Sequence, residues 1–229
     1  MGEARLSLDP RLRALADMVG SCRVFADIGT DHGRLGAYLL QNRRCALAQF
    51  TDISDASLQK ARALIERLHL TGRAVFSVGD GAAALLEPAD VVVIAGMGGT
   101  TIAGIVERGL TALGNARLLL QPNVAAPELR ERLSCVGYAI TDERVVPDAG
   151  RNYILIAAER GSAVYDERQL VVGPVLLERR PLELLPYARF RLRVSRKALS
   201  GAVGRDAQVE KQLCREIEIW EEVERWLQP

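Results

Sequence analysis

The chain has 229 residues and a formal net charge of +1, with 48% hydrophobic and 26% charged residues. This composition is typical of a soluble globular protein with a sizeable core, and the length allows one domain and an appendage. The apolar runs are far shorter than the ~20 residues of a membrane span, so the sequence predicts no membrane-spanning helix. The near-neutral total charge indicates no particular partner.

The N-terminus and the cysteines bear on location. Residues 1–19 carry acids early and lack the apolar core of a secretory signal. The four cysteines lie far apart and form no C-x-x-C pair, and only two histidines could help them to hold a metal. We therefore expect buried free thiols in a reducing cytoplasm, and no metal site.

Short apolar runs alternate with helical patterns from residue 24 to about residue 160. The runs predict strands at Val24–Ile28, Leu47–Thr51, Ala74–Val78, Val91–Ala95 and Arg117–Leu120. The patterns between them predict helices at Leu35–Gln41, Ala56–Leu70, Thr101–Leu113 and Pro127–Val136. This alternation is typical of βαβ units and a largely parallel sheet, and uniformly apolar strands are typical of a sheet covered on both faces.

The rhythm changes after Gly137. The strand-like runs YAITDERVV and NYILIAAER are joined by a short loop with Pro and Gly, which is too short for a crossover helix. They should form an antiparallel hairpin. Five parallel strands closed by such a hairpin resemble the plan of the class I methyltransferases, so we expect an α/β fold with a Rossmann-like seven-stranded sheet.

The C-terminal part reads as a separate helical domain. Three prolines between residues 174 and 186 limit helices there to short pieces. Long helices follow at Leu184–Leu199 and Ala207–Leu227, joined by a glycine-containing link that indicates an antiparallel hairpin. Their apolar stripes are expected to contain Leu185, Leu192 and Leu199 in the first helix and Val209, Leu213, Ile217, Trp220, Val223 and Leu227 in the second.

Charge is distributed unevenly over this part. Residues 174–205 contain eight basic and two acidic residues, and residues 206–229 contain seven acidic and three basic ones. The opposite balance favours pairing of the two helices. We predict a cofactor-binding domain at residues 1–163, a coiled-coil-like helical domain at residues 164–229, and a monomer.

The stretch FADIGTDHGRL, at the end of the first predicted strand, carries the first functional signal. Ligands of open α/β sheets bind at the carboxyl ends of the strands, and Gly29 and Gly33 allow sharp turns there. A dinucleotide site has glycines at such a turn because it binds a pyrophosphate, whereas this turn has Asp27 and Asp31. Two acids suit a cationic ligand such as S-adenosyl-L-methionine, which has a sulfonium and an ammonium but no phosphate. His32 is either a further cofactor contact or a structural residue.

Acids also follow the next two predicted strands. Asp52 is placed to accept hydrogen bonds from ribose hydroxyls, and Asp80 to meet an adenine amino group. Each alone could be a helix cap or a solvated loop residue, but an acid after three successive strands favours a cofactor site. Gly81, and Gly96 and Met97 in the loop AGMGG, complete this predicted site.

Three motifs, DIGTDHGRL, GMGG and QPN, occur in this order on the predicted strand plan, ahead of a helical hairpin. Together they resemble the bacterial TrmK-type family of tRNA adenine-N1 methyltransferases, over nearly the whole chain. The resemblance implies methyl transfer from S-adenosyl-L-methionine to N1 of an adenine in tRNA, which is adenine 22 in that family. Neutral adenine has an in-plane lone pair on N1, so no general base is strictly required before attack.

The QPN motif supplies the catalytic candidates. The amides of Gln121 and Asn123 can hydrogen-bond a base edge, and the glycines of GMGG leave room for a base that has been extruded from the RNA. Asp31 is the third catalytic candidate. Alternatively, QPN is a simple strand-to-helix turn with Asn123 as the cap.

RNA binding requires cations against phosphates. The predicted contacts are Arg179, Arg180, Arg189, Arg193, Arg196 and Lys197, with Arg5, Arg11 and Arg13 as further candidates. The alternative is that these cations only pair with acids of the neighbouring helix, such as Glu216, Glu218 and Glu221.

Two other functions also remain open, a small-molecule methyltransferase on the same fold and a non-catalytic module that binds RNA or the cofactor.

Overall fold

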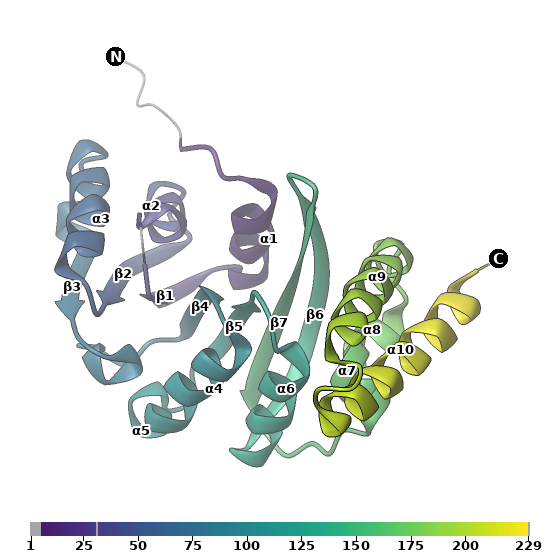
Figure 1. Ribbon diagram of the computed structural model, residues 1–229. Helices are drawn as coiled ribbons and strands as arrows, with labels where there is room; N and C mark the ends of the chain where they lie inside the picture. Colours follow the sequence, from purple (N-terminus) through teal and green to yellow (C-terminus); the bar gives the residue numbers. More distant parts are fainter. Residues whose placement is uncertain (1–5, 31, 229) are drawn as a thin grey trace. The chain divides into compact units, whose positions relative to one another are not determined.

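The computed structural model describes residues 6–30 and 32–228, and the chain divides into two compact units between Val164 and Tyr165. The first unit contains the sheet and helices α1 to α6, and the second contains helices α7 to α10 (Figure 1). Within the described residues, no helix is both long and apolar enough to cross a membrane. The same residues contain no group of three or more His, Cys, Asp or Glu side chains that could hold a metal ion.

One seven-stranded sheet forms the centre of the first unit. Its strands are β1 (Cys22–Ile28), β2 (Cys45–Asp52), β3 (Ala74–Val78), β4 (Val91–Met97), β5 (Arg117–Pro122), β6 (Tyr138–Asp148) and β7 (Arg151–Arg160). The order is β3-β2-β1-β4-β5-β7-β6, in which the pairings among β1 to β5 are parallel and β7 runs antiparallel to both β5 and β6. The predicted fold class is confirmed, and each predicted strand lies within an observed one.

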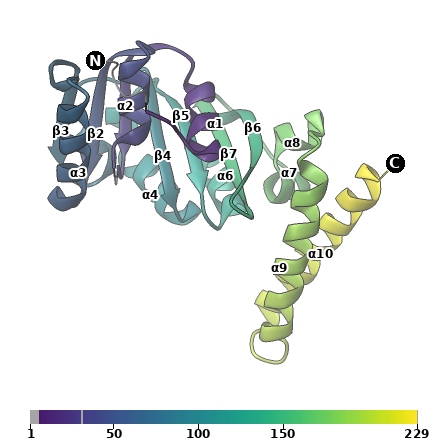
Figure 2. The ribbon, with the colours of Figure 1, turned by 90° about the horizontal axis from the view of Figure 1, so that it is seen from above.

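Helices cover both faces of this sheet. They are α1 (Pro10–Val19), α2 (Arg34–Gln41), α3 (Asp55–Arg67), α4 (Gly99–Arg108), α5 (Leu110–Leu113) and α6 (Ala126–Cys135). Helices α1, α2 and α3 pack on one face and α4 and α6 on the other (Figures 1 and 2). The predicted helix over residues 101–113 is interrupted at Gly109, where an added Cβ would lie 2.4 Å from that of Ala82. Gly109 is the C-cap of α4, and α5 begins at the next residue.

A tight turn joins β6 to β7. Ala149 and Gly150 occupy its two central positions with φ of 47° and 77°. Positive φ at both positions is the pattern of a type I′ hairpin turn, which matches the natural twist of the two strands. The predicted antiparallel hairpin is therefore present, and Asp148 pairs with Arg151 next to the turn.

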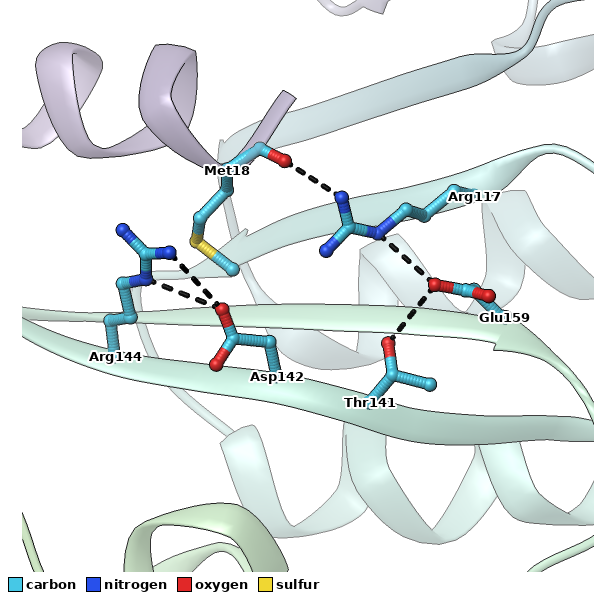
Figure 3. Close-up of polar contacts among 6 residues, drawn as sticks. All are labelled: Met18, Arg117, Thr141, Asp142, Arg144 and Glu159. Carbon is cyan, nitrogen blue, oxygen red and sulfur yellow. Dashed lines mark hydrogen bonds and ion pairs between the residues drawn. The ribbon is translucent and has the colours of Figure 1, made fainter. Parts of the chain in front are cut away.

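Polar contacts fix the end of α1 to the strands β5, β6 and β7 (Figure 3). The Arg117 guanidinium donates to the main-chain oxygen of Met18 at 2.7 Å and pairs with Glu159 at 3.2 Å. The Thr141 hydroxyl donates to the same carboxylate at 3.4 Å. Because Arg117 begins β5, the last turn of α1 is anchored at the start of that strand, which fixes the direction in which α1 crosses the sheet.

The cysteines differ from expectation in one respect. All four are free thiols, and Cys45 is buried, but Cys135 and Cys214 are exposed. The prediction of burial is therefore wrong for these two, which lie on the solvent-facing sides of α6 and α10.

The second unit contains α7 (Glu167–Val172), α8 (Pro174–Arg179), α9 (Leu184–Ala202) and α10 (Ala207–Leu227). Helices α9 and α10 form the predicted hairpin, with Tyr187 edge-on to Trp220 at 5.5 Å between ring centroids. The buried stripe of α9 runs through Leu184, Ala188, Leu192 and Ser195, whereas Leu185 and Leu199 are only partly buried. A strict spacing of seven drifts around a straight helix with 3.6 residues per turn, so the predicted stripe is displaced at both ends.

Ion pairs connect the two long helices. Arg191 contacts Glu216 at 2.6 Å, Arg196 contacts Glu221 at 2.7 Å, and Arg189 contacts Glu224 at 2.8 Å. The expected pairing of a basic with an acidic helix is thus present. Glu218 differs from the prediction, because it pairs with Arg215 of its own helix at 2.9 Å.

Candidate active site

A cavity of about 350 Å³ opens at the carboxyl ends of β1 and β4. Its size lies in the range of small-molecule sites. Six of the predicted cofactor residues line it, namely Asp27, Gly29, His32, Gly33, Gly96 and Met97. The first turn of α1 also lines it, through Asp9, Arg11 and Leu12.

The turn after β1 is held by backbone hydrogen bonds to the end of β2. The amides of Gly29 and Thr30 both donate to the Thr51 carbonyl, at 2.8 and 3.2 Å. Gly29 has φ of 78°, and a Cβ there would lie 2.0 Å from the methyl carbon of Met97. Gly33 is similarly constrained, because its φ is 61° and a Cβ would lie 2.8 Å from that of Ala61. Both glycines are therefore required by the geometry, and Gly29 leaves bare backbone facing the cavity.

Asp27 has an unusual environment. The Thr30 hydroxyl donates to its carboxylate at 2.8 Å, and the same hydroxyl accepts from the Gly33 amide at 3.1 Å. Burial raises the pKa of Asp27 to about 6, the hydrogen bond from Thr30 opposes the rise, nearby Asp52 adds to it, and Arg11 counteracts it. The carboxylate is thus ionised at neutral pH in a position where its charge is unfavourable until a cation meets it.

The GMGG and QPN motifs form one rigid double loop. The Asn123 amide donates to the Met97 carbonyl, and the Gly99 amide donates to the Val124 carbonyl, both at 2.8 Å. A Cβ on Gly99 would lie 2.0 Å from the Ala125 carbonyl oxygen, so only glycine permits this approach. The two motifs lie far along the chain from the turn after β1, yet all three reach the same edge of the sheet because their strands are parallel.

The two catalytic candidates of QPN occupy different environments. Gln121 is fully buried, and its amide nitrogen donates to the Asn123 side-chain oxygen at 3.0 Å. Asn123 is exposed, and its own amide nitrogen donates to the Gly96 carbonyl at 2.7 Å. The geometry therefore leaves Asn123 accessible to a ligand, with Gln121 beneath it. Asp31, the third catalytic candidate, and Arg5, a candidate RNA contact, lie outside the described residues.

Asp52 and Asp80 lie at the ends of β2 and β3. Asp52 accepts a hydrogen bond from the Ser54 amide at 2.7 Å, and the adjacent Ile53 side chain is 80% exposed. Asp80 pairs with Arg108 at 3.3 Å, and Asp80 and Gly81 line a separate cavity of about 150 Å³. Six predicted cofactor residues thus line the larger cavity, Asp80 and Gly81 line the smaller one, and Asp52 lines neither of these two.

Sequence reasoning did not place three residues that the structure brings to this site. Thr30 touches Asp27, Arg11 reaches Gln121, and Ile53 presents an apolar surface beside Asp52. Thr30 and Ile53 are adjacent in sequence to the predicted residues Asp31 and Asp52, so their position in the sequence could have indicated them. Arg11 had no such signal, because its contact to Gln121 spans 110 residues.

The sheet order, with β7 antiparallel between β5 and β6 and a cavity at the end of β1, defines a class I methyltransferase fold. The family model described as TrmK, tRNA (adenine(22)-N(1))-methyltransferase, matches residues 25–222. The chain belongs to this TrmK family, whose members are tRNA methyltransferases that use S-adenosyl-L-methionine.

Relatives agree with the family model. The tRNA (adenine(22)-N(1))-methyltransferase of Bacillus subtilis is 37% identical over 179 residues, which cover 75% of each chain. The crystal structure of B. subtilis TrmK superimposes with a TM-score of 0.85 and 30% identity, covering 96% of this chain and 99% of that one. The structure of Sp1610 from Streptococcus pneumoniae in complex with S-adenosyl-L-methionine gives a TM-score of 0.86 and 27% identity, covering 95% of this chain and all of that one.

The double loop makes a testable distinction between two adjacent glycines. We expect Gly99→Ala to lower the free energy of unfolding by about 1–3 kcal/mol, because backbone atoms of residues 124 and 125 must move. Gly98→Ala is the matched control, since its added Cβ would meet nothing closer than 3.7 Å. Urea denaturation of both variants measures the difference, and equal losses would contradict the close approach of the two loops.

Asp27 makes a pH-dependent prediction. Its folded-state pKa of about 6 lies above the ordinary 3.8, so stability is highest when the group is protonated and falls as pH rises from 4 to 6. Asp27→Asn should therefore raise the free energy of unfolding at pH 8, by up to about 3 kcal/mol, while it weakens binding of S-adenosylhomocysteine. In the unaltered protein this affinity should fall as pH drops below 6.

Calorimetry at pH 5, 6, 7 and 8 and thermal melting of both proteins provide the test. Affinity that stays constant across this range in the unaltered protein would refute a role for the ionised Asp27 in binding. If Asp27→Asn is less stable than the unaltered protein at pH 8, the ionised Asp27 carboxylate does not destabilise the fold.

Proposed function

We propose that this chain methylates N1 of adenine 22 in tRNA, with the cofactor in the cavity beside β1 and the acceptor base at the exposed side of the GMGG–QPN double loop. The observation that supports this most directly is that the exposed amide of Asn123 is fixed at the rim formed by Gly96 and Met97, two residues that also line the cavity. A cofactor site and a candidate base contact therefore share the same loop.

The residues around the cavity fit a cationic cofactor. S-adenosyl-L-methionine supplies a methyl group carried on a sulfonium. We assign Asp27 to its charged amino-acid part, because a cation would remove the electrostatic cost of the partly buried carboxylate. Gly29, Gly33 and Gly96 offer backbone without side chains, and His32 and Met97 complete the lining.

The outer parts of the cofactor would extend toward β2 and β3. Asp52 can accept hydrogen bonds from ribose hydroxyls, and the exposed Ile53 can cover a flat adenine ring. Asp80, followed by Gly81, can accept from the adenine amino group if its exposed contact with Arg108 is shared. Asp31, which lies between Thr30 and His32 in the sequence, is retained as a candidate for both cofactor binding and catalysis on its sequence position alone.

On the acceptor side, Asn123 is the residue that we place against the base. Its side-chain oxygen can accept a hydrogen bond from the exocyclic amino group of adenine, which leaves N1 to face the methyl group. Gln121 is buried and acts beneath Asn123. Proximity and alignment, without a general base, are the main contributions that the reaction needs from the protein.

A stripe of cations on α9 supports tRNA binding. Arg189, Arg193 and Lys197 follow one another at intervals of four, so they lie on one side of the helix. Arg189 and the nearby Arg196 are engaged with Glu224 and Glu221. Arg193 and Lys197 are exposed and form no ion pair with any residue in the described ranges 6–30 and 32–228, so their charge is fully available to phosphates.

Arg179 and Arg180, at the end of α8, are the remaining proposed RNA contacts. The Arg180 guanidinium lies 3.7 Å from the centroid of the Trp226 ring.

We propose residues 1–163 as the cofactor-binding domain and residues 164–229 as a helical domain that contributes to tRNA binding. We also propose that the enzyme acts as a monomer in the cytoplasm, where tRNA is available.

The proposed reaction is tested with labelled cofactor and a tRNA transcript that contains adenine 22, beside a control transcript in which guanine replaces that adenine. We expect 1-methyladenosine by nucleoside analysis and no label in the control transcript. Asn123→Ala should lower the rate about 10²-fold, the size typical for loss of one positioned hydrogen bond. Label in the control transcript would refute the position. Turnover without RNA would favour a small-molecule substrate. Cofactor binding without methyl transfer would favour a non-catalytic module.

The tRNA surface is tested with two matched double variants. We expect Arg193→Gln/Lys197→Gln to weaken tRNA binding and to reduce the log–log salt slope by about 1.5, since each phosphate contact contributes roughly 0.7–0.9. Its melting temperature should not change, because neither side chain is paired within the unit. Arg189→Gln/Arg196→Gln should lower stability by about 0–1 kcal/mol per exposed ion pair and affect the slope less.

Filter binding at several salt concentrations, together with thermal melting, measures both quantities. An unchanged slope in the Arg193/Lys197 variant would mean that the cations of α9 serve only the hairpin.

A further inference from the structure

Arg11, which the sequence suggested only as a further RNA contact, lines the candidate active site from helix α1. Asp9 caps α1, accepting from the Leu12 amide at 2.8 Å, and Pro10 occupies the first helical position. This cap determines where α1 begins and so places Arg11 in its first turn. The Arg11 guanidinium donates to the Gln121 side-chain oxygen at 2.8 Å and lies over the Tyr153 ring, 5.4 Å from its centroid.

The contact is one of two constraints on the orientation of two successive side-chain amides, those of Gln121 and Asn123. A guanidinium has only donors, so Gln121 must turn its oxygen toward Arg11 and its nitrogen away. That nitrogen donates to the Asn123 oxygen at 3.0 Å, which leaves the Asn123 nitrogen to donate to the Gly96 carbonyl at 2.7 Å. The Gly96 carbonyl can only accept, so it favours the same orientation from the other end, and without Arg11 this carbonyl alone would hold the two amides.

We propose that Arg11 is a positioning residue for methyl transfer, which acts through the buried Gln121 to fix the side-chain orientation of Asn123 at the acceptor base. This inference rests on the proposed role of Asn123. With its orientation fixed, Asn123 presents an oxygen that still has a lone pair, which matches the amino group of adenine. The opposite orientation would present a donor and would repel that amino group.

The surroundings of Arg11 support a positioning role over a phosphate contact. Gln121 is completely buried, so its hydrogen bond to Arg11 stays out of competition with water on the Gln121 side. Tyr153 covers one face of the guanidinium and restricts its movement. Arg11 also lines the same cavity as Asp27, so its side chain is on the cavity side of α1.

Arg13 provides a matched control on the same helix. Its guanidinium donates to the Tyr38 hydroxyl and lies 4.7 Å from the centroid of that ring, so it shares the aromatic contact but does not reach Gln121. Removal of either arginine changes the total charge equally. Only removal of Arg11 should affect Asn123.

The experiment compares Arg11→Met, Arg11→Lys, Arg13→Met, Asn123→Ala and the Arg11→Met/Asn123→Ala double variant. We expect Arg11→Met to lower the single-turnover rate on the adenine-22 tRNA by about 10- to 100-fold, with the KM for tRNA changed less than about threefold. Arg11→Lys should recover part of the rate, since an ammonium can still donate to Gln121. In the Asn123→Ala background the further loss should be below about threefold, because the group that Arg11 positions is already absent.

A second readout is independent of activity. In the unloaded, ¹⁵N-labelled protein, the side-chain amide signals of Gln121 and Asn123 should shift in Arg11→Met and stay in place in Arg13→Met. If Arg11→Met proves less stable, the amide signals of Arg11→Lys are compared with those of the unaltered protein instead.

The outcomes separate this inference from the proposed function. If the unaltered protein makes no 1-methyladenosine, the proposed function fails, and the amide signals still report on the contact. If the unaltered protein is active but Arg11→Met and Asn123→Ala have fully additive effects, the positioning role is refuted. A rise in the KM for tRNA alone, with a weaker salt dependence, would refute it in favour of a phosphate contact.

Discussion

The parallel pairing of β1, β2, β4 and β5 is the constraint on which the active site depends. Because these strands run in the same direction, the loops that follow them emerge at one edge of the sheet. Backbone hydrogen bonds then join the loops in pairs, the turn after β1 to the end of β2 and GMGG to QPN. Hydrogen bonds between backbone atoms therefore fix the loops of the site. Glycines occupy the positions where a side chain would prevent this close contact.

The cost of the site is concentrated in Asp27. A carboxylate that is ionised near neutral pH while partly buried lowers stability, and the Thr30 hydroxyl and Arg11 remove only part of that cost. A neutral amide in the same place would be easier to fold. A charge at this position therefore supports the proposed cationic ligand, because unfavourable charges are common at functional sites.

The sequence was sufficient for the strands, the class of fold and the glycine-containing turn after β1, because these follow from local periodicity and from residue types at strand ends. It was insufficient where position depends on the packing of distant segments. The residue pattern did not indicate that Gln121 is buried while Asn123 is exposed two residues later. The predicted strand ended at Leu120, whereas β5 extends through Gln121 to Pro122. Likewise, the basic stripe of α9 was visible, but only the structure separates the paired Arg189 and Arg196 from Arg193 and Lys197.

Helix α1 shows how an element outside the alternation of strands and helices can contribute to the proposed site. Its last turn is fixed at the start of β5 through Arg117, and its first turn meets the end of the same strand through Arg11. The helix is thus held at both ends of one strand, so the guanidinium of Arg11 stands at a defined height above Gln121. A side chain that reached the site from a loop would have to be ordered each time the base bound, whereas one on a doubly anchored helix is ordered beforehand. Preorganisation of this kind suits a reaction in which alignment, rather than proton transfer, is the main task of the protein.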